Sequence, residues 1–133
     1  MIDIEDEVFT GVQTAVIAEY PDAFVVGKET RTPSKFPCVS IVEADNFVVD
    51  RTQDSGSMEN HVNLMYEVNV YSNKSKGSKA ECKSILAIVD NAFMSMGFTR
   101  IMKAPVSLDD ATKFRLIARY NAVASKDRTI YRR

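Results

Sequence analysis

The sequence predicts an α+β fold: a two-layer sandwich in which two helices cover one face of a mixed, mostly antiparallel sheet. Two segments have apolar residues at three- and four-residue spacing, which is typical of amphipathic helices. Five others are β-branched or alternate apolar with polar residues, which is typical of strands. Their order is α-β-β-β-α-β-β. A length of 133 residues fits a single domain over 1–133, and no repeat divides it.

The first helix is expected over residues 3–19. Asp3 is the predicted N-cap, Asp6 follows it at capping-box spacing, and acidic residues favour the first turn because of the helix dipole. The helix should end at Tyr20, because a residue that precedes a proline avoids helical geometry. Its buried stripe is formed by Ile4, Val8, Val12, Ala15 and Val16.

Three strands should follow the first helix. A short one is expected over 23–27 and a β-branched one over 38–44, joined by a loop with two prolines. The strict alternation over 61–71 is the clearest strand pattern in the chain. Residues 50–60 are almost devoid of apolar side chains, so they are expected to form a long hairpin tip or a mobile loop.

The second helix is expected to begin with a capping box, in which Ser78 is the N-cap and Glu81 reaches back to it. Gly97 should end this helix in a left-handed conformation. Two more strands are predicted over 98–102 and 112–120, and the polar, basic residues 125–133 are expected to be a tail or arm. The helix's buried stripe is formed by Cys82, Ile85, Leu86, Val89 and Phe93.

Catalytic chemistry finds little support in the residue pattern. The only histidine is His61. Two distant cysteines, Cys38 and Cys82, fit buried reduced thiols better than a disulfide or a zinc site. Glu43 and Asp45 are predicted to share one strand face, yet no electrophile or metal-ligand spacing accompanies them. We therefore expect no enzymatic activity, no catalytic residues, no cofactor and no metal.

Composition and charge argue against several other classes of protein. No apolar run approaches the length of a membrane span, and the acidic first residues are unlike a secretory signal, so neither a membrane protein nor an exported one is expected. The lysines of residues 74–79 precede a helix, but they lack the glycine pattern of a phosphate-binding loop. A sequence pI near 5.8 also argues against sequence-specific DNA binding.

Charge is distributed unevenly along the chain. Residues 1–27 contain six acidic residues and no Lys or Arg, whereas residues 100–133 contain nine basic and three acidic residues. The two ends could pair within one fold or lie on separate solvated faces. Alternatively, an acidic face of one copy could meet a basic face of the next copy in a ring. The sequence leaves these alternatives open.

Several stretches together resemble the tail-terminator (tail-completion, minor tail) proteins of long-tailed bacteriophages and prophages. They are residues 36–46 (FPCVSIVEADN), 66–73 (YEVNVYSN), the second helix, 96–100 (MGFTR) and 119–123 (RYNAV). The likeness extends over nearly the whole chain, and it lies in size and in the order of strands and helices rather than in a catalytic signature.

The resemblance implies a structural virion protein of the tail and neck, made in the host bacterial cytoplasm. Such proteins form a ring, expected to be a hexamer, on the last ring of tail-tube protein. The ring stops tube polymerisation and offers a docking surface to the head-tail connector or stopper protein, and DNA passes through it without sequence-specific binding. The candidate interface residues are Asp3, Glu5, Asp6, Glu7, Arg51, Gln53, Asp54, Met58, Glu59, Arg128, Tyr131, Arg132 and Arg133.

Two other functions remain open on the sequence. Another neck component, such as a head-completion or stopper protein, would share the size and the ring. A small ligand-binding domain would instead need a concave cluster of polar residues, which the sequence does not indicate. Binding to tail-tube protein would distinguish a terminator from a stopper, because the stopper binds portal or adaptor.

Overall fold

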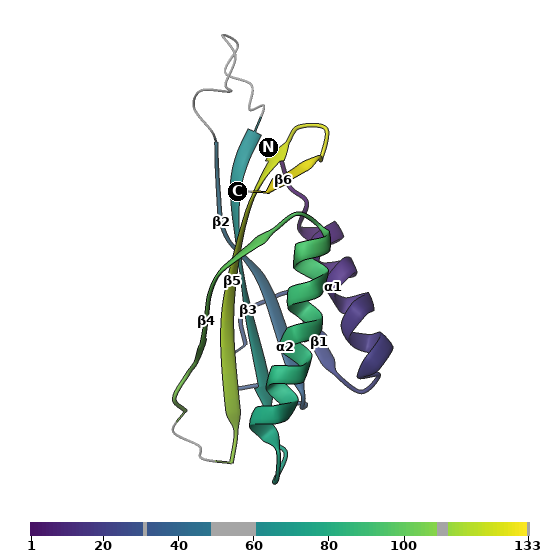
Figure 1. Ribbon diagram of the computed structural model, residues 1–133, viewed down its shortest axis with the longest axis vertical. Coiled ribbons are helices and arrows are strands. Elements are labelled where there is room, and N and C mark those ends of the chain that lie inside the picture. The colour runs from purple at the N-terminus through teal and green to yellow at the C-terminus, as the bar shows by residue number, and fades with distance from the viewer. Residues whose placement is uncertain (31, 49–60, 109–111, 133) are drawn as a thin grey trace.

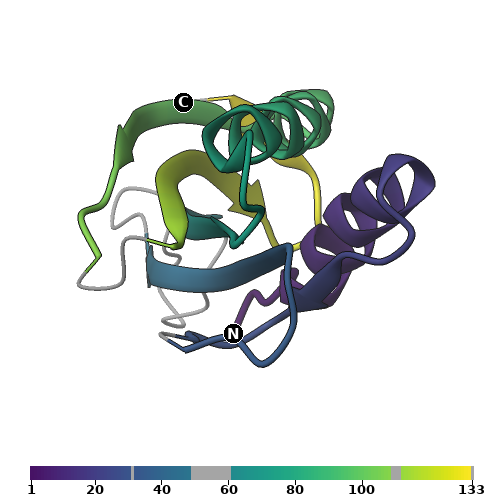
Figure 2. The ribbon, with the colours of Figure 1, turned by 90° about the horizontal axis from the view of Figure 1, so that it is seen from below.

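The computed structural model has the predicted α+β architecture and describes residues 1–30, 32–48, 61–108 and 112–132. Two helices, α1 (Glu5–Glu19) and α2 (Ser78–Ser95), lie side by side against one face of a mixed sheet (Figure 1). The view from below shows that this sheet is curved and that both helices lie on the same side of it (Figure 2). The prediction of two helices on one face is confirmed.

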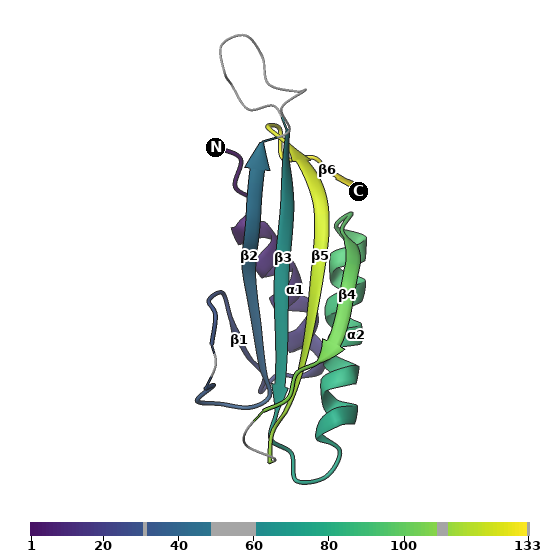
Figure 3. The same cartoon turned by 90° about the vertical axis from the view of Figure 1, so that its left-hand side faces the viewer.

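The described part of the sheet has six strands in the order β1-β2-β3-β5-β4, with β6 also paired to β5. β1 runs parallel to β2 and every other pair is antiparallel, as predicted. Figure 3 shows β2 and β4 on opposite sides of the sheet with the helices behind. The strands are β1 (Phe24–Val26), β2 (Cys38–Val48), β3 (His61–Ser72), β4 (Thr99–Pro105), β5 (Phe114–Ser125) and β6 (Ile130–Arg132).

Four aromatic rings form the centre of the core, where α2 packs on the sheet. Phe93 stacks on Tyr120 with ring centroids 4.2 Å apart and meets Phe98 edge-on at 5.2 Å. Tyr66 contacts Phe98 edge-on at 5.5 Å. Offset and edge-to-face ring pairs contribute about 0.5–1.5 kcal/mol each beyond the burial of their area. Because all four rings are buried, this cluster fixes α2 over β3 and β5.

The predicted stop of α2 at Gly97 is confirmed. Gly97 has φ 100°, and its N–H donates to the carbonyl of Met94 at 3.1 Å. The N–H of Phe98 donates to the carbonyl of Phe93 at 3.0 Å, which completes a Schellman motif. The apolar contact that accompanies this motif is the Phe93–Phe98 ring pair, so the helix end and the core are one unit.

Both predicted helix starts need correction. α1 begins at Glu5 with Ile4 at the N-cap, and the Asp3 carboxylate accepts the Glu5 N–H at 3.0 Å from one position further upstream. The N-cap of α2 is Gly77, not Ser78. Glu81 does not close a capping box, because its carboxylate instead accepts the hydroxyl of Ser72 at 2.6 Å. That contact ties the first turn of α2 to the end of β3.

The expected tail over residues 125–133 is also corrected. Residues 130–132 form β6, which pairs with β5 along the edge that β4 leaves free. Ile130 packs against the core and lies beside Gly97. The strands predicted over 38–44, 98–102 and 112–120 extend further than expected, to residues 48, 105 and 125. In β2 and β4 the strand continues past a β-bulge.

Replacing Gly97 by alanine should destabilise the protein by about 2 kcal/mol or more, because the left-handed conformation strains any L side chain by roughly 1–2 kcal/mol. The added methyl would also lie 3.1 Å from Cγ2 of Ile130. Gly77→Ala is the matched control: its φ is 82°, and its added methyl would meet nothing within 4 Å. Urea unfolding should show the larger loss for Gly97→Ala, and equal losses would contradict the packing role of β6.

Candidate functional site

The face of the sheet that points away from the helices is the candidate functional site. On β3, the residues from Val62 to Val70 at even positions are buried under the helices. The intervening residues point to the opposite face, where they line up with partners on β2 and β5 in cross-strand rows. In the described part of the chain no helix covers this face (Figure 3). An antiparallel sheet with one bare face is free to bind a partner there.

One end of this face is closed by the segment between β1 and β2. The Tyr71 hydroxyl donates to the carbonyl of Thr30 at 2.7 Å, and the Ser40 hydroxyl donates to the carbonyl of Lys28 at 2.9 Å. Both contacts lie near the end of β3. They bury Tyr71 and Ser40, so any partner must approach the middle or the other end of the face.

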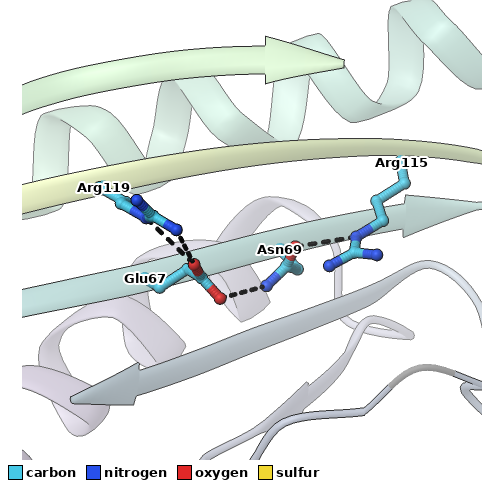
Figure 4. Close-up of polar contacts among 4 residues, drawn as sticks. All are labelled: Glu67, Asn69, Arg115 and Arg119. Atoms are coloured by element: carbon cyan, nitrogen blue, oxygen red, sulfur yellow. Dashed lines mark hydrogen bonds and ion pairs between the residues drawn. The ribbon is translucent and has the colours of Figure 1, made fainter. Parts of the chain in front are cut away.

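A polar network crosses the middle of the face (Figure 4). Both Nε and Nη2 of Arg119 lie 3.1 Å from Oε1 of Glu67. Asn69 donates from Nδ2 to the other oxygen of Glu67 at 3.4 Å, and it accepts from Nε of Arg115 at 2.9 Å. The Arg115 guanidinium also lies 5.3 Å from the centre of the Tyr71 ring. The network therefore satisfies a nearly buried Asn69 and presents the half-exposed Arg119 to solvent.

The other end of the face carries exposed aromatic side chains. Phe47, Asn63, Val123 and Tyr131 stand next to one another across four strands. Phe47 is 46% exposed and Tyr131 is 47% exposed. This end of the sheet extends beyond the helices in Figure 1. Exposed aromatic rings in a row with an apolar Val123 are typical of a protein contact surface, so we call these four residues the tip row.

His61 borders the tip row. Its ring centroid lies 5.8 Å from that of Tyr131, and its Nδ1 atom is buried without a hydrogen-bond partner. A buried ring nitrogen without a hydrogen-bond partner costs free energy. The ring of His61 therefore packs near the exposed ring of Tyr131.

The predicted pairing of Glu43 and Asp45 on one face is wrong. A β-bulge between them shifts the register, so Glu43 stands opposite Tyr66 and Asp45 opposite Met65. Glu43 therefore points toward the helix layer, where Asn46 donates to its carboxylate at 3.0 Å. Burial raises the pKa of Glu43 despite the Asn46 hydrogen bond, and the charges of nearby acids, Asp3 foremost, raise it further.

The acidic first residues and the basic last residues meet in the fold. The Glu7 carboxylate and the Arg128 guanidinium form an exposed ion pair. This contact supports pairing of the two chain ends within one molecule, at least for these two residues. Glu5 accepts the main-chain N–H of Glu43 at 3.3 Å, while Asp3 and Asp6 are exposed.

Two more of the predicted interface residues lie on β6. Tyr131 belongs to the tip row, and Arg132 is the last residue of β6. Sequence reasoning missed Phe47 and Arg119; the apolar run over residues 47–49 was the available signal that the strand continues to Phe47. The expected loop over 50–60 lies outside the described part of the chain. So do the predicted interface residues Arg51, Gln53, Asp54, Met58, Glu59 and Arg133.

The two cysteines are buried free thiols, as predicted. Burial raises the pKa of Cys38 to about 11 and that of Cys82 to about 12. Thiols with such pKa values stay protonated and unreactive near neutral pH. Among the described residues, no group of three or more His, Cys, Asp or Glu side chains is placed to hold a metal ion. Neither described helix has the length and apolar character of a membrane span.

Comparisons with known proteins do not assign the chain. No protein-family model matches the sequence, and no curated protein gives a significant match. Function must therefore be argued from the surfaces described above.

Glu43→Gln should stabilise the protein at pH 7.5, because glutamine keeps an acceptor for Asn46 and removes a partly buried charge among other acids. The gain should shrink near pH 4. The pKa is raised in the fold, so the carboxylate opposes folding only once the pH rises above its unfolded value. Urea titrations at both pH values measure this.

Glu67→Gln is the control for that measurement. It weakens the ion pair with Arg119, so it should lower stability, by about 0–1 kcal/mol for a partly exposed pair. A Glu43→Gln variant that is less stable than the wild type at pH 7.5 would show that the carboxylate's hydrogen bond outweighs its burial and the neighbouring charges.

Proposed function

We propose that the chain is a structural subunit that caps the tail tube of a long-tailed bacteriophage or a related particle. Copies form a ring on the end of the tube, stop tube polymerisation and provide the surface to which the head connector docks. Support comes from the sequence resemblance to tail-terminator proteins and from the helix and strand order, which agrees with that resemblance up to the additional β6.

The single observation that carries the proposal is the uncovered sheet face that ends in the tip row. Phe47 and Tyr131 each leave close to half of a large ring in water. Burying the exposed part of one such ring would gain roughly 2 kcal/mol. Two rings at a projecting end of the sheet are a contact surface of the kind that an assembly subunit needs.

The middle of the same face, next to the tip row, carries the polar network of Glu67, Asn69, Arg115 and Arg119. Arg119 and Glu67 already pair with each other, so a partner need not supply a counter-charge for them. Interfaces commonly have such a polar rim and an aromatic core. Tail-tube protein is the proposed occupant of the tip row, and the connector or stopper protein is the proposed partner on the opposite side of the ring.

Deleting the gene tests the proposal. Particles made without the protein should carry tails of irregular, mostly excessive length that fail to join heads, and electron microscopy measures both. Tails of normal length would remove the terminator assignment. If tails are normal but heads remain unjoined, the alternative of a stopper or another neck component takes its place.

A double variant, Phe47→Ser with Tyr131→Ser, should keep the fold but lose capping, because both side chains are half exposed and contribute little to the core. Complementation of the deletion measures capping, and circular dichroism checks folding. Met94→Ser, on the exposed side of the helix layer, is the matched control and should restore normal tails. Normal tails with the double variant would show that the tip row is not the contact with the tube.

A further inference from the structure

The last strand, β6, is joined to the rest of the subunit by few contacts. It is three residues long, and in the described part of the chain it pairs only with residues 122–124 of β5. Ile130 packs against the core beside Gly97, whereas Tyr131 is 47% exposed. A short strand near a chain end, with little apolar burial, is the kind of element that opens locally while the rest of a protein stays folded.

The turn that leads into β6 contains a strained residue. The Arg128 N–H donates to the carbonyl of Ser125 at 2.9 Å, and the Ser125 N–H donates to the carbonyl of Thr129 at 2.9 Å. These bonds enclose a three-residue loop, whose last residue commonly adopts the left-handed conformation that suits glycine. Here that residue is Arg128, with φ 70°. Its side chain therefore strains the hairpin in the conformation that pairs β6 with β5.

The polar contacts of this turn offset the strain only in part. The Arg128 guanidinium pairs with the Glu7 carboxylate of α1, but both side chains are more than half exposed. Exposed ion pairs contribute little to stability. Asp127 accepts the Thr129 N–H at 3.2 Å, a bond that lies within the turn and does not join it to the rest of the fold. The paired position of β6 therefore depends mainly on the packing of Ile130.

The position of β6 determines whether the tip row is complete. Tyr131 stands next to Val123 only because β6 pairs with β5. If β6 leaves β5, the tip row loses one of its two exposed aromatic rings, while Phe47 stays in place on β2. The same movement breaks the contacts with Glu7 of α1 and with Gly97 after α2. Figure 1 shows β6 and its turn next to the ends of both helices.

We propose that residues 126–132 form a clasp, which opens and closes while the rest of the subunit stays folded, so that the tip row is complete only in the closed form. A partner that contacts Tyr131 binds the closed form better and shifts the equilibrium toward it. Its apparent affinity is lowered in proportion to the fraction of open subunits. That this partner is tail-tube protein rests on the proposed function, whereas the movement of the clasp does not.

Amide hydrogen exchange of the free subunit, measured by NMR, tests the clasp. The Ser125 N–H bonds to the carbonyl of Thr129, so it is released when the clasp opens. It should be protected about 100-fold or more less than the amides in the middle of β3, which exchange only when the whole subunit unfolds. Equal protection at Ser125 and in β3 would overturn the proposal. A complete lack of protection at Ser125 would overturn it too, because the clasp would then have no closed form.

Ile130→Ala and Ile88→Ala are matched variants, because both isoleucines are partly buried against the core, one on β6 and the other on α2. Ile130→Ala weakens only the closed form, so protection of the Ser125 amide should fall by about tenfold or more. Ile88→Ala weakens the open and the closed forms alike. It should lower the protection of β3 and leave that of Ser125 unchanged. Equal falls at Ser125 in the two variants would show that β6 leaves β5 only when the whole subunit unfolds.

A disulfide that locks the clasp gives a second, independent test. Ala122→Cys with Arg132→Cys places two cysteines opposite each other on β5 and β6, while Cys38 and Cys82 are buried. Once mass spectrometry shows the new disulfide, the oxidised protein should protect the Ser125 amide about tenfold or more better than the same protein after reduction, because the lock prevents opening. No change on oxidation would contradict the clasp.

The same locked variant connects the clasp to the tail tube. Its oxidised form should cap tubes at a lower concentration than its reduced form, because every subunit then presents a complete tip row. Equal capping by the two forms would contradict the role of the clasp in tube binding. Absence of capping by both forms would count against the proposed function, and the exchange measurements on the free subunit would still decide whether the clasp opens.

Discussion

Burial of every second side chain of β3 is the constraint on which the rest of the structure depends. Tyr66 lies at the middle of that buried set, where it pairs with Glu43 of β2 and with Tyr120 of β5. A shift of one residue would move the whole buried set to the bare face and expose the core. The same alternation leaves Asn63, Met65 and Glu67 on the side without helices. One pattern thus determines both the core and the surface available to partners.

The aromatic cluster connects this constraint to α2 and to the charged surface. Tyr120 stacks on Phe93 inside the core, and its hydroxyl donates to Asp90 at 3.0 Å. Asp90 in turn pairs with Arg100 of β4 at 2.9 Å. A buried ring, a helix carboxylate and an edge-strand arginine are therefore coupled. This coupling holds β4 in a defined position relative to the helix layer.

The features that could be predicted from the sequence are those set by local periodicity. Helical spacing located α1 and α2, strand alternation located β3, and the left-handed Gly97 could be foreseen because few other residues adopt that conformation at a helix end. The features that could not be predicted depend on partners distant in sequence. β6 exists because β5 continues beyond β4, and Glu81 bonds to Ser72 rather than closing its own cap.

The residues of the candidate site also divide into those that local sequence predicts and those that depend on distant partners. Tyr131 was predicted as a contact residue from its type and its polar surroundings. Its neighbours in the tip row were not, since Phe47 reaches that row only because a bulge changes the phase of β2. Glu7 and Arg128 were assigned to partner contacts, whereas their exposed ion pair joins them within one molecule. Ion pairs between residues distant in sequence and β-bulges depend on the tertiary structure, so composition alone could not reveal them.

The most direct test of the account is to locate the protein in the particle whose genome encodes it. Electron cryomicroscopy of intact particles should show a closed ring of copies between the head-proximal end of the tail tube and the head connector. Within that ring, the tip rows should face the tube. Absence of the protein from that position, or its presence elsewhere in the particle, would contradict the account.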